Sequence, residues 1–174
     1  MSLLKRLFGN TEPDPKLKLV PLYNQIVAKA RLPHWYVEGQ VPDSIDGRFD
    51  MIAAILTLVI LRLEDDPARG QDMAHLTEVF VDDMDGQLRE VGIGDMIVGK
   101  HIGRIMGAFG GRLGAFRDAF AEPAMLDDTI LRNIYRSETA GAAALAHVRQ
   151  GLLDIERALG AQLPDMVAEG SAEW

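Results

Sequence analysis

The sequence predicts an all-α fold, a single compact bundle of about six helices. Apolar residues recur at spacings of three and four along most of the chain, which is the period of an amphipathic helix. No segment alternates apolar and polar residues as a half-buried strand does, and breaks that contain Pro or Gly separate the helical stretches. With 174 residues, 48% of them hydrophobic, the chain can bury one core. We expect an N-terminal segment and linker over 1–15, the all-α domain over 16–160 and a flexible tail over 161–174.

The overall charge and the absence of cysteine limit the classes of function. A net charge of −8 opposes long-range attraction to nucleic acid or anionic lipid, so we expect no specific DNA binding. Because the chain has no cysteine, disulfides, thiolate nucleophiles and iron–sulfur ligation are excluded. A cytoplasmic location is the default expectation.

The first nine residues, MSLLKRLFG, place Leu3, Leu4, Leu7 and Phe8 around two basic residues. This segment is too short and too interrupted for a signal peptide. Three interpretations stay open: contact with a membrane surface, folding back on the domain, or a frayed end. The polar stretch NTEPDP that follows predicts a linker.

Two helices are predicted on either side of an aromatic loop. Residues 19–30 have helical spacing, and a proline follows them. The loop over 33–42 contains His, Trp and Tyr and is expected to pack against the domain. Asp43 or Ser44 caps the next helix, which is apolar almost continuously to residue 63. A helix that is apolar on nearly all sides occupies the centre of a bundle.

The rest of the chain predicts four more helical segments. One covers about 71–91 and ends at a Gly-Ile-Gly break. A second runs from 95 to about 120, with Asp95 as its cap, and a short one follows over 125–135. The last carries an apolar seam and ends at Gly160.

The segment over 95–120 has three different sides on a helical projection. Its glycines lie on one side: Gly99, Gly103, Gly107, Gly110, Gly111 and Gly114. Apolar residues form a second: Val98, Ile102, Ile105, Met106, Phe109, Leu113, Phe116 and Phe120. The third is basic: Lys100, His101, Arg104 and Arg112. Each interior glycine costs roughly 0.5–1 kcal/mol relative to alanine, so the glycine side needs an explanation.

The apolar side is expected to join the core. The glycine side lets another backbone approach closely, either a neighbouring helix of this chain or a partner segment that binds in a groove. The basic side is either a solvated surface that balances nearby acids or a binding face.

Motifs for catalysis or metal binding are missing. VDDMDG lacks the first and twelfth ligands of a calcium loop, and Gly-Ile-Gly follows no strand as a dinucleotide loop would. The four histidines are isolated and have no metal-ligand spacing. We therefore expect no metal and no cofactor, and these motifs give no argument for an enzyme.

Two blocks resemble the signature blocks of the ubiquinol-cytochrome c chaperone family: VPDSIDGRFDM at Val41–Met51 and DMDGQLREVGIGDMIVGKHIGRIMGAFGGRL at Asp83–Leu113. The resemblance extends upstream through LYNQIVAKARLPHWY and covers roughly residues 22–120. It implies an all-α, non-enzymatic protein. Mitochondrial members of this family bind newly made cytochrome b during assembly of ubiquinol-cytochrome c reductase, together with a small partner protein near the ribosome exit.

The resemblance also implies roles for individual residues. Matching positions that we expect to be structural are Asp43, Asp46, Gly47, Phe49, Asp83, Asp85, Arg89, Gly92, Gly94, Asp95, Gly99 and Gly111. Candidate partner-binding residues are Arg48, Lys100, Arg104, Arg112, Gly103, Gly107 and Gly110. The last three depart from the family pattern, which has longer polar residues or a tyrosine there. For Arg48 the alternative is an internal ion pair with Asp46, Asp83 or Asp85.

The resemblance implies a non-catalytic assembly chaperone that binds newly made cytochrome b, with a small partner protein or the ribosome as further partners. It would act in the cytoplasm, and contact with the inner membrane through residues 1–9 stays open. The alternative is a helical carrier or enzyme that holds a haem, quinone or isoprenoid between helices.

Overall fold

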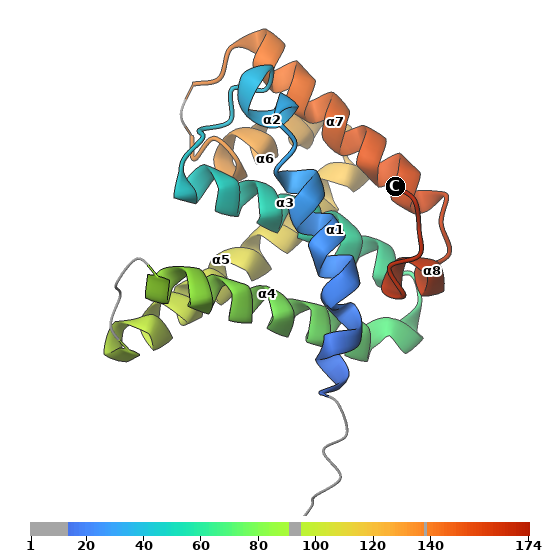
Figure 1. The fold of residues 1–174 in the computed structure, drawn as a ribbon. Coiled ribbons are helices and arrows are strands. Elements are labelled where there is room, and N and C mark those ends of the chain that lie inside the picture. The colour runs from blue at the N-terminus through green and yellow to red at the C-terminus, as the bar shows by residue number, and fades with distance from the viewer. Residues whose placement is uncertain (1–13, 91–94, 138) are drawn as a thin grey trace, which may run out of the picture.

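The computed structural model confirms the all-α prediction (Figure 1). It describes residues 14–90, 95–137 and 139–174, without the side chains of 88–90, 95–102, 104 and 105. The longer helices are α1 (Val20–Ala30), α3 (Ile45–Leu63), α4 (Gly70–Glu90), α5 (Asp95–Ala121), α6 (Leu126–Asn133) and α7 (Ala142–Gly160). Shorter elements are η2 (Pro15–Leu19), α2 (His34–Val37), η3 (Pro67–Arg69), η4 (Pro123–Met125) and α8 (Pro164–Ala168).

Helix α3 lies at the centre of the fold, as its apolar run predicts. Every residue from Met51 to Ile60 is buried, and the helix contacts α1, α4, α5, α7 and α8. Figure 1 shows α1 crossing α3, with α4 and α5 on one side and α2, α6 and α7 on the other. Of the two predicted caps, Ser44 caps α3, since its side chain accepts a hydrogen bond from Gly47 N at 3.1 Å.

The aromatic loop packs on the domain, as expected, and includes the single turn α2. The buried indole of Trp35 donates from Nε1 to the carbonyl oxygen of Lys29 at 2.8 Å. A Cβ at Gly151 of α7 would lie 2.5 Å from Trp35 Cη2, so glycine there lets the ring lie against the helix. The loop is thereby fixed between α1 and α7.

The expectation of a flexible tail over 161–174 is corrected by the structure. This segment contains α8, and Val167, Ala168 and Ala172 are buried. Gln25 of α1 donates to the carbonyl oxygen of Gly170 at 2.7 Å, where the left-handed backbone (φ 68°) favours glycine. The sequence of this segment is mostly polar, and only a few of its residues face the core. Its packing is therefore difficult to predict from the sequence.

None of the helices in the described part of the chain has the length and hydropathy needed to span a bilayer.

Candidate functional site

The glycine side of α5 is open in the described structure. Gly103, Gly107, Gly110 and Gly111 are exposed, and Gly114 is half-buried. A Cβ built on any of these five would meet no atom of the described residues within 4 Å. Of the two alternatives for this side, a neighbouring helix that crosses the glycines is not seen among the described residues. Gly99 lies outside the described side chains.

The opposite side of α5 joins the core, as predicted. Phe109, Phe116 and Ala119 are buried, and the ring centroid of Phe109 lies 5.5 Å from that of Phe80 on α4. Met106 is a correction, because 38% of it is exposed. It lies at the edge of the apolar sector, next to the glycines, and so belongs to the open surface. Helix α5 thus presents its glycines, bordered by this methionine, away from the core.

Arg112 is buried, which corrects its placement on an exposed basic side. Its Nη2 lies 2.7 Å from Asp50 Oδ1 and donates to the carbonyl oxygen of Asn133 at 2.9 Å. The guanidinium also lies 5.7 Å from the ring centroid of Phe49. Burial lowers the pKa of Arg112, and the nearby Asp50 carboxylate opposes this effect. Arg112 therefore joins α5 to α3 and to the end of α6.

Sequence reasoning missed Asp50, which is 1% exposed and binds two arginines. Arg136 donates from Nε to Asp50 Oδ2 at 2.6 Å and from Nη1 to Asp46 at 2.8 Å. The hydrogen bond to Asp50 is the largest cause of the raised pKa of Arg136. We call Asp46, Asp50, Arg112 and Arg136 the Asp50 cluster. The available signal was an acidic residue directly before the apolar run of this helix, since a buried carboxylate needs a cationic partner.

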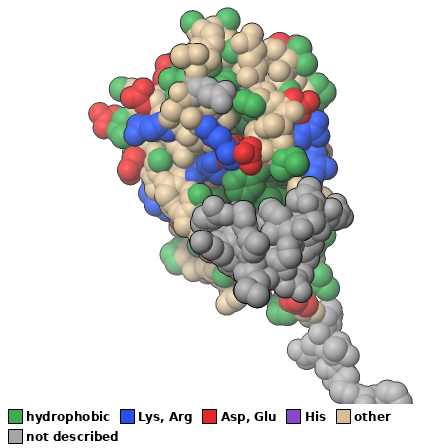
Figure 2. All heavy atoms as spheres, turned by 90° about the vertical axis from the view of Figure 1, so that its left-hand side faces the viewer, with side chains coloured by type: hydrophobic (Ala, Val, Ile, Leu, Met, Phe, Trp, Pro, Cys, Tyr) green, Lys and Arg blue, Asp and Glu red, His purple; other side chains and the backbone are tan. Residues whose placement is uncertain are grey.

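The Asp50 cluster lies on the face where α3 begins, which Figure 2 presents with Lys and Arg side chains gathered around acidic ones. Arg136 and Ser137 both have left-handed backbones, with φ of 53° and 65°. Such conformations are uncommon for residues other than glycine and persist only where the surrounding contacts hold them. The paired guanidinium of Arg136 is one of these contacts.

Arg48 pairs with Asp43 instead of the alternatives Asp46, Asp83 or Asp85. Its Nε lies 2.6 Å from Asp43 Oδ1, both side chains are exposed, and its guanidinium lies 5.7 Å from the Tyr36 ring centroid. Asp43 raises the pKa of Arg48 through this hydrogen bond. Arg48 is thus an exposed cation that lies close to Asp50 in the sequence.

Contacts explain some of the remaining motif positions, and others lie outside the description. A Cβ at Gly47 would overlap the carbonyl oxygen of Pro42, which explains the glycine. Asp83 accepts a hydrogen bond from Tyr23 Oη at 2.7 Å, and burial followed by this bond raises the pKa of Tyr23. Phe49 packs on the core, with its ring centroid 5.8 Å from that of Phe80. The predictions for these positions fall on side chains or residues outside the description: Arg89, Gly92, Gly94, Asp95, Gly99, Lys100 and Arg104.

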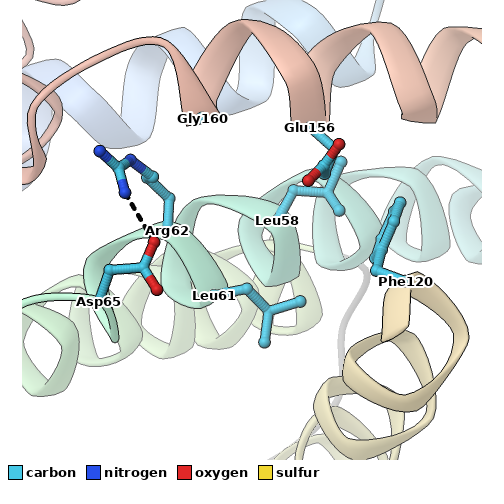
Figure 3. A pocket seen from close by; sticks show the side chains of 7 residues that line it. All are labelled: Leu58, Leu61, Arg62, Asp65, Phe120, Glu156 and Gly160. Carbon is cyan, nitrogen blue, oxygen red and sulfur yellow. Dashed lines mark hydrogen bonds and ion pairs between the residues drawn. The ribbon is translucent and has the colours of Figure 1, made fainter. Parts of the chain in front are cut away.

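A pocket lies between α3, α5 and α7 (Figure 3). Its volume is about 190 Å³, and its lining residues are Leu58, Leu61, Arg62, Asp65, Phe120, Glu156 and Gly160. Small-molecule sites usually have about 300–1,000 Å³. The guanidinium of Arg62 is already held by Asp65 at 2.6 Å and by the carbonyl oxygen of Gln162. This pocket therefore gives no support to the carrier hypothesis, and within the described ranges no cluster of His, Asp and Glu could hold a metal ion.

Comparison with known proteins agrees with the resemblance seen in the sequence. The model of a family described as Ubiquinol-cytochrome C chaperone matches residues 37–174. The fold is similar to the crystal structure of the Cbp3 homolog from Brucella abortus, with a TM-score of 0.80 and 27% sequence identity. That match covers 99% of this chain and 96% of the other chain. No curated protein sequence matches the chain significantly.

Proposed function

Because this chain belongs to the ubiquinol-cytochrome c chaperone family, we propose that it is a non-catalytic assembly chaperone that binds newly made cytochrome b during biogenesis of ubiquinol-cytochrome c reductase. The observation that carries the site is the open glycine side of α5. A chaperone for a membrane protein needs a surface that receives an apolar helix reversibly, and a groove that accepts a helix is one way to build it.

The open side of α5 suits such a client in size and shape. From Gly103 to Gly114 the helix rises by about 16 Å, roughly half of the hydrocarbon thickness of a bilayer. Without side chains on this side, a client helix can approach the α5 backbone closely and gain dispersion contacts along its length. We propose that Gly103, Gly107 and Gly110 form the floor of this contact.

Side chains at the border of the glycines would complete the contact. Met106 is exposed at one border, and its flexible, polarisable side chain adapts to apolar surfaces of different shape. We propose that Lys100 and Arg104 on the other border meet acidic loops of the client or anionic headgroups. Arg48 is proposed as a separate contact for a small partner protein or the ribosome, since it is exposed.

The Asp50 cluster supports this role indirectly. Arg112 and Arg136 bring α5 and the segment after α6 to the same carboxylate on α3. The ion pair of Arg112 with Asp50 fixes the rotation of α5 about its axis. Since Arg112 lies on the side of α5 opposite the glycines, the glycines then face outward. Arg112 is therefore proposed to act by orienting the glycine side instead of touching the client.

The proposed function is tested by the reduced-minus-oxidised spectrum of membranes from cells that lack this gene. We expect selective loss of the cytochrome b signal, with the terminal oxidase unchanged as the internal control. The intact gene should restore the signal. Unchanged cytochrome b in the deletion strain would contradict the proposal.

A further inference from the structure

A second surface lies outside the proposed client site, in a groove of mixed apolar and charged lining between η2–α1 and α4. Its volume is about 520 Å³. Leu17, Val20, Val27 and Val79 provide apolar lining, and Leu17 is 54% exposed. Lys16 reaches across one end of the groove to Asp82, with 2.7 Å between Nζ and Oδ2. The described residues leave this lining without a covering element.

The groove has the length and spacing to accept a short helix. Leu17, Val20, Asn24, Val27 and Arg31 line it at intervals of three and four, along one face of η2–α1. This face extends over about 20 Å at the rise of a helix. An amphipathic helix of eight or nine residues, about 13 Å long, therefore fits along it.

We propose that residues 1–9 of this same chain dock in the groove as an amphipathic segment. Residues 1–13 lie outside the described structure, and the described chain begins at Asp14. Asp14 Oδ1 accepts a hydrogen bond from Lys16 N at 3.1 Å and caps η2, so the segment is tethered at one end of the groove. The linker over 10–13 reaches about 13 Å when extended, which lets the segment turn back along α1.

The composition of the segment matches the groove. Its Leu3, Leu4, Leu7 and Phe8 recur at helical spacing and can cover the apolar lining. The wall opposite α1 is acidic, because Asp82 and Asp83 of α4 line the groove.

The two basic residues of the segment, Lys5 and Arg6, complement this acidic wall in a chain whose net charge is −8. Tethering also raises the effective concentration of the segment to about the millimolar range, so a weak intrinsic affinity is sufficient.

The test uses the absence of native cysteine, which allows a single nitroxide on Ser2→Cys in the full chain. This label leaves all four apolar residues of the segment in place. We expect loss of amide NMR signal at Val20–Val27 and Val79–Asp83, with α7 signals retained. Leu17→Asp should restore the groove signals, whereas Leu163→Asp, a change at a leucine of similar exposure (66%), should leave the loss unchanged.

Three outcomes would overturn the inference. One is a signal loss that is uniform over the free chain, or no signal loss at all. This outcome counts against docking even if the labelled chain binds vesicles of phosphatidylglycerol. The second is a groove signal loss that Leu17→Asp and Leu163→Asp relieve equally. The third is an equal loss when labelled chains are mixed with unlabelled isotope-enriched chains, since this would make a second copy the occupant.

Discussion

Asp50 links three parts of the chain through one buried carboxylate. Its oxygens bind Arg112 of α5 and Arg136 of the segment after α6 at 2.7 and 2.6 Å. A buried ion pair contributes little compared with a well-packed apolar replacement, but removal of one partner leaves an uncompensated charge. The cluster therefore acts mainly by fixing which way its three elements face.

The change Asp50→Asn should lower the free energy of unfolding by about 3–5 kcal/mol, because Arg112 would stay buried without its counter-charge. Arg136→Gln should cost about 1 kcal/mol or less, since 48% of that side chain is exposed. Urea unfolding of both variants measures the difference. Equal losses in the two variants would contradict a buried charge centred on Asp50.

Gly47 illustrates a motif residue with a steric explanation. Gly47→Ala should destabilise the protein by about 1–3 kcal/mol, because the new Cβ would overlap the Pro42 carbonyl and force the backbone to move. Gly86→Ala is the matched control, at an exposed helical glycine with nothing described within 4 Å. It should stabilise the protein by roughly 0.5–1 kcal/mol. Thermal unfolding separates the two, and a neutral Gly47→Ala would refute the steric account.

His34 gives the fold a predicted sensitivity to acid. Its Nδ1 lies 2.9 Å from His147 Nε2, and burial followed by the nearby His147 lowers the pKa of His34 below 6.5. The unfolded chain therefore binds a proton at His34 more readily than the folded protein does. The free energy of unfolding is then highest above about pH 6.5 and decreases as the pH falls through the folded-state pKa of His34. His34→Gln should show a smaller loss of stability between pH 7.5 and pH 5. Parallel pH profiles for both proteins would contradict this prediction.

At the scale of elements, α5 combines two requirements that the sequence keeps on separate sides. Phe109 and Phe116 hold it in the core, and the glycines leave its outer side bare. Glycine lowers helix stability, and the described surroundings give no steric reason for it at these positions. The proposed approach of a client helix would supply a reason.

The triple change Gly103→Ala, Gly107→Ala and Gly110→Ala should raise the free energy of unfolding by about 1.5–3 kcal/mol, since each new methyl enters open space. The same variant should restore less cytochrome b than the parent in the deletion strain. Gly86→Ala, with a similar local gain, should restore it fully. A stabilised triple variant with full function would remove the glycine side from the mechanism.

Helix boundaries could be predicted from the sequence because they depend on local chemistry. Ser44 caps α3, and proline follows the ends of α1 and α5, so these limits were correct within a few residues. Helix α8 could not be predicted, since its stability comes from a few contacts with distant elements. A projection finds the glycine side of α5 but gives no information on what covers it.

The candidate site shows the same division. Arg112 projects beside Arg104 on one helix, and only the tertiary structure shows that Asp50, 62 positions earlier in the chain, buries it. From the family motif we expected Gly47 to be structural and Arg112 to bind a partner. The carbonyl oxygen of Pro42 gives Gly47 a steric role, whereas Arg112 is buried against a residue far away in the sequence. Such long-range pairs are visible only in the folded structure.

At the scale of the whole molecule, the fold presents two separate surfaces around one core. The open side of α5 is the proposed client surface, and the groove between α1 and α4 is the proposed site of residues 1–9. Helix α3 lies between α1 and α5 and contacts both. The proposed docking of residues 1–9 in the groove would therefore leave the glycines uncovered.

The most direct measurement is cross-linking from the glycine side to cytochrome b during its synthesis. Gly107→Cys, in a chain without other cysteines, would carry a benzophenone at the centre of the open side. Gly160→Cys, at an exposed helical glycine with equally open surroundings, is the control. We expect a cross-link to newly made cytochrome b from Gly107→Cys alone. Equal cross-linking from both positions, or none from Gly107→Cys while the variant still supports assembly, would contradict the account.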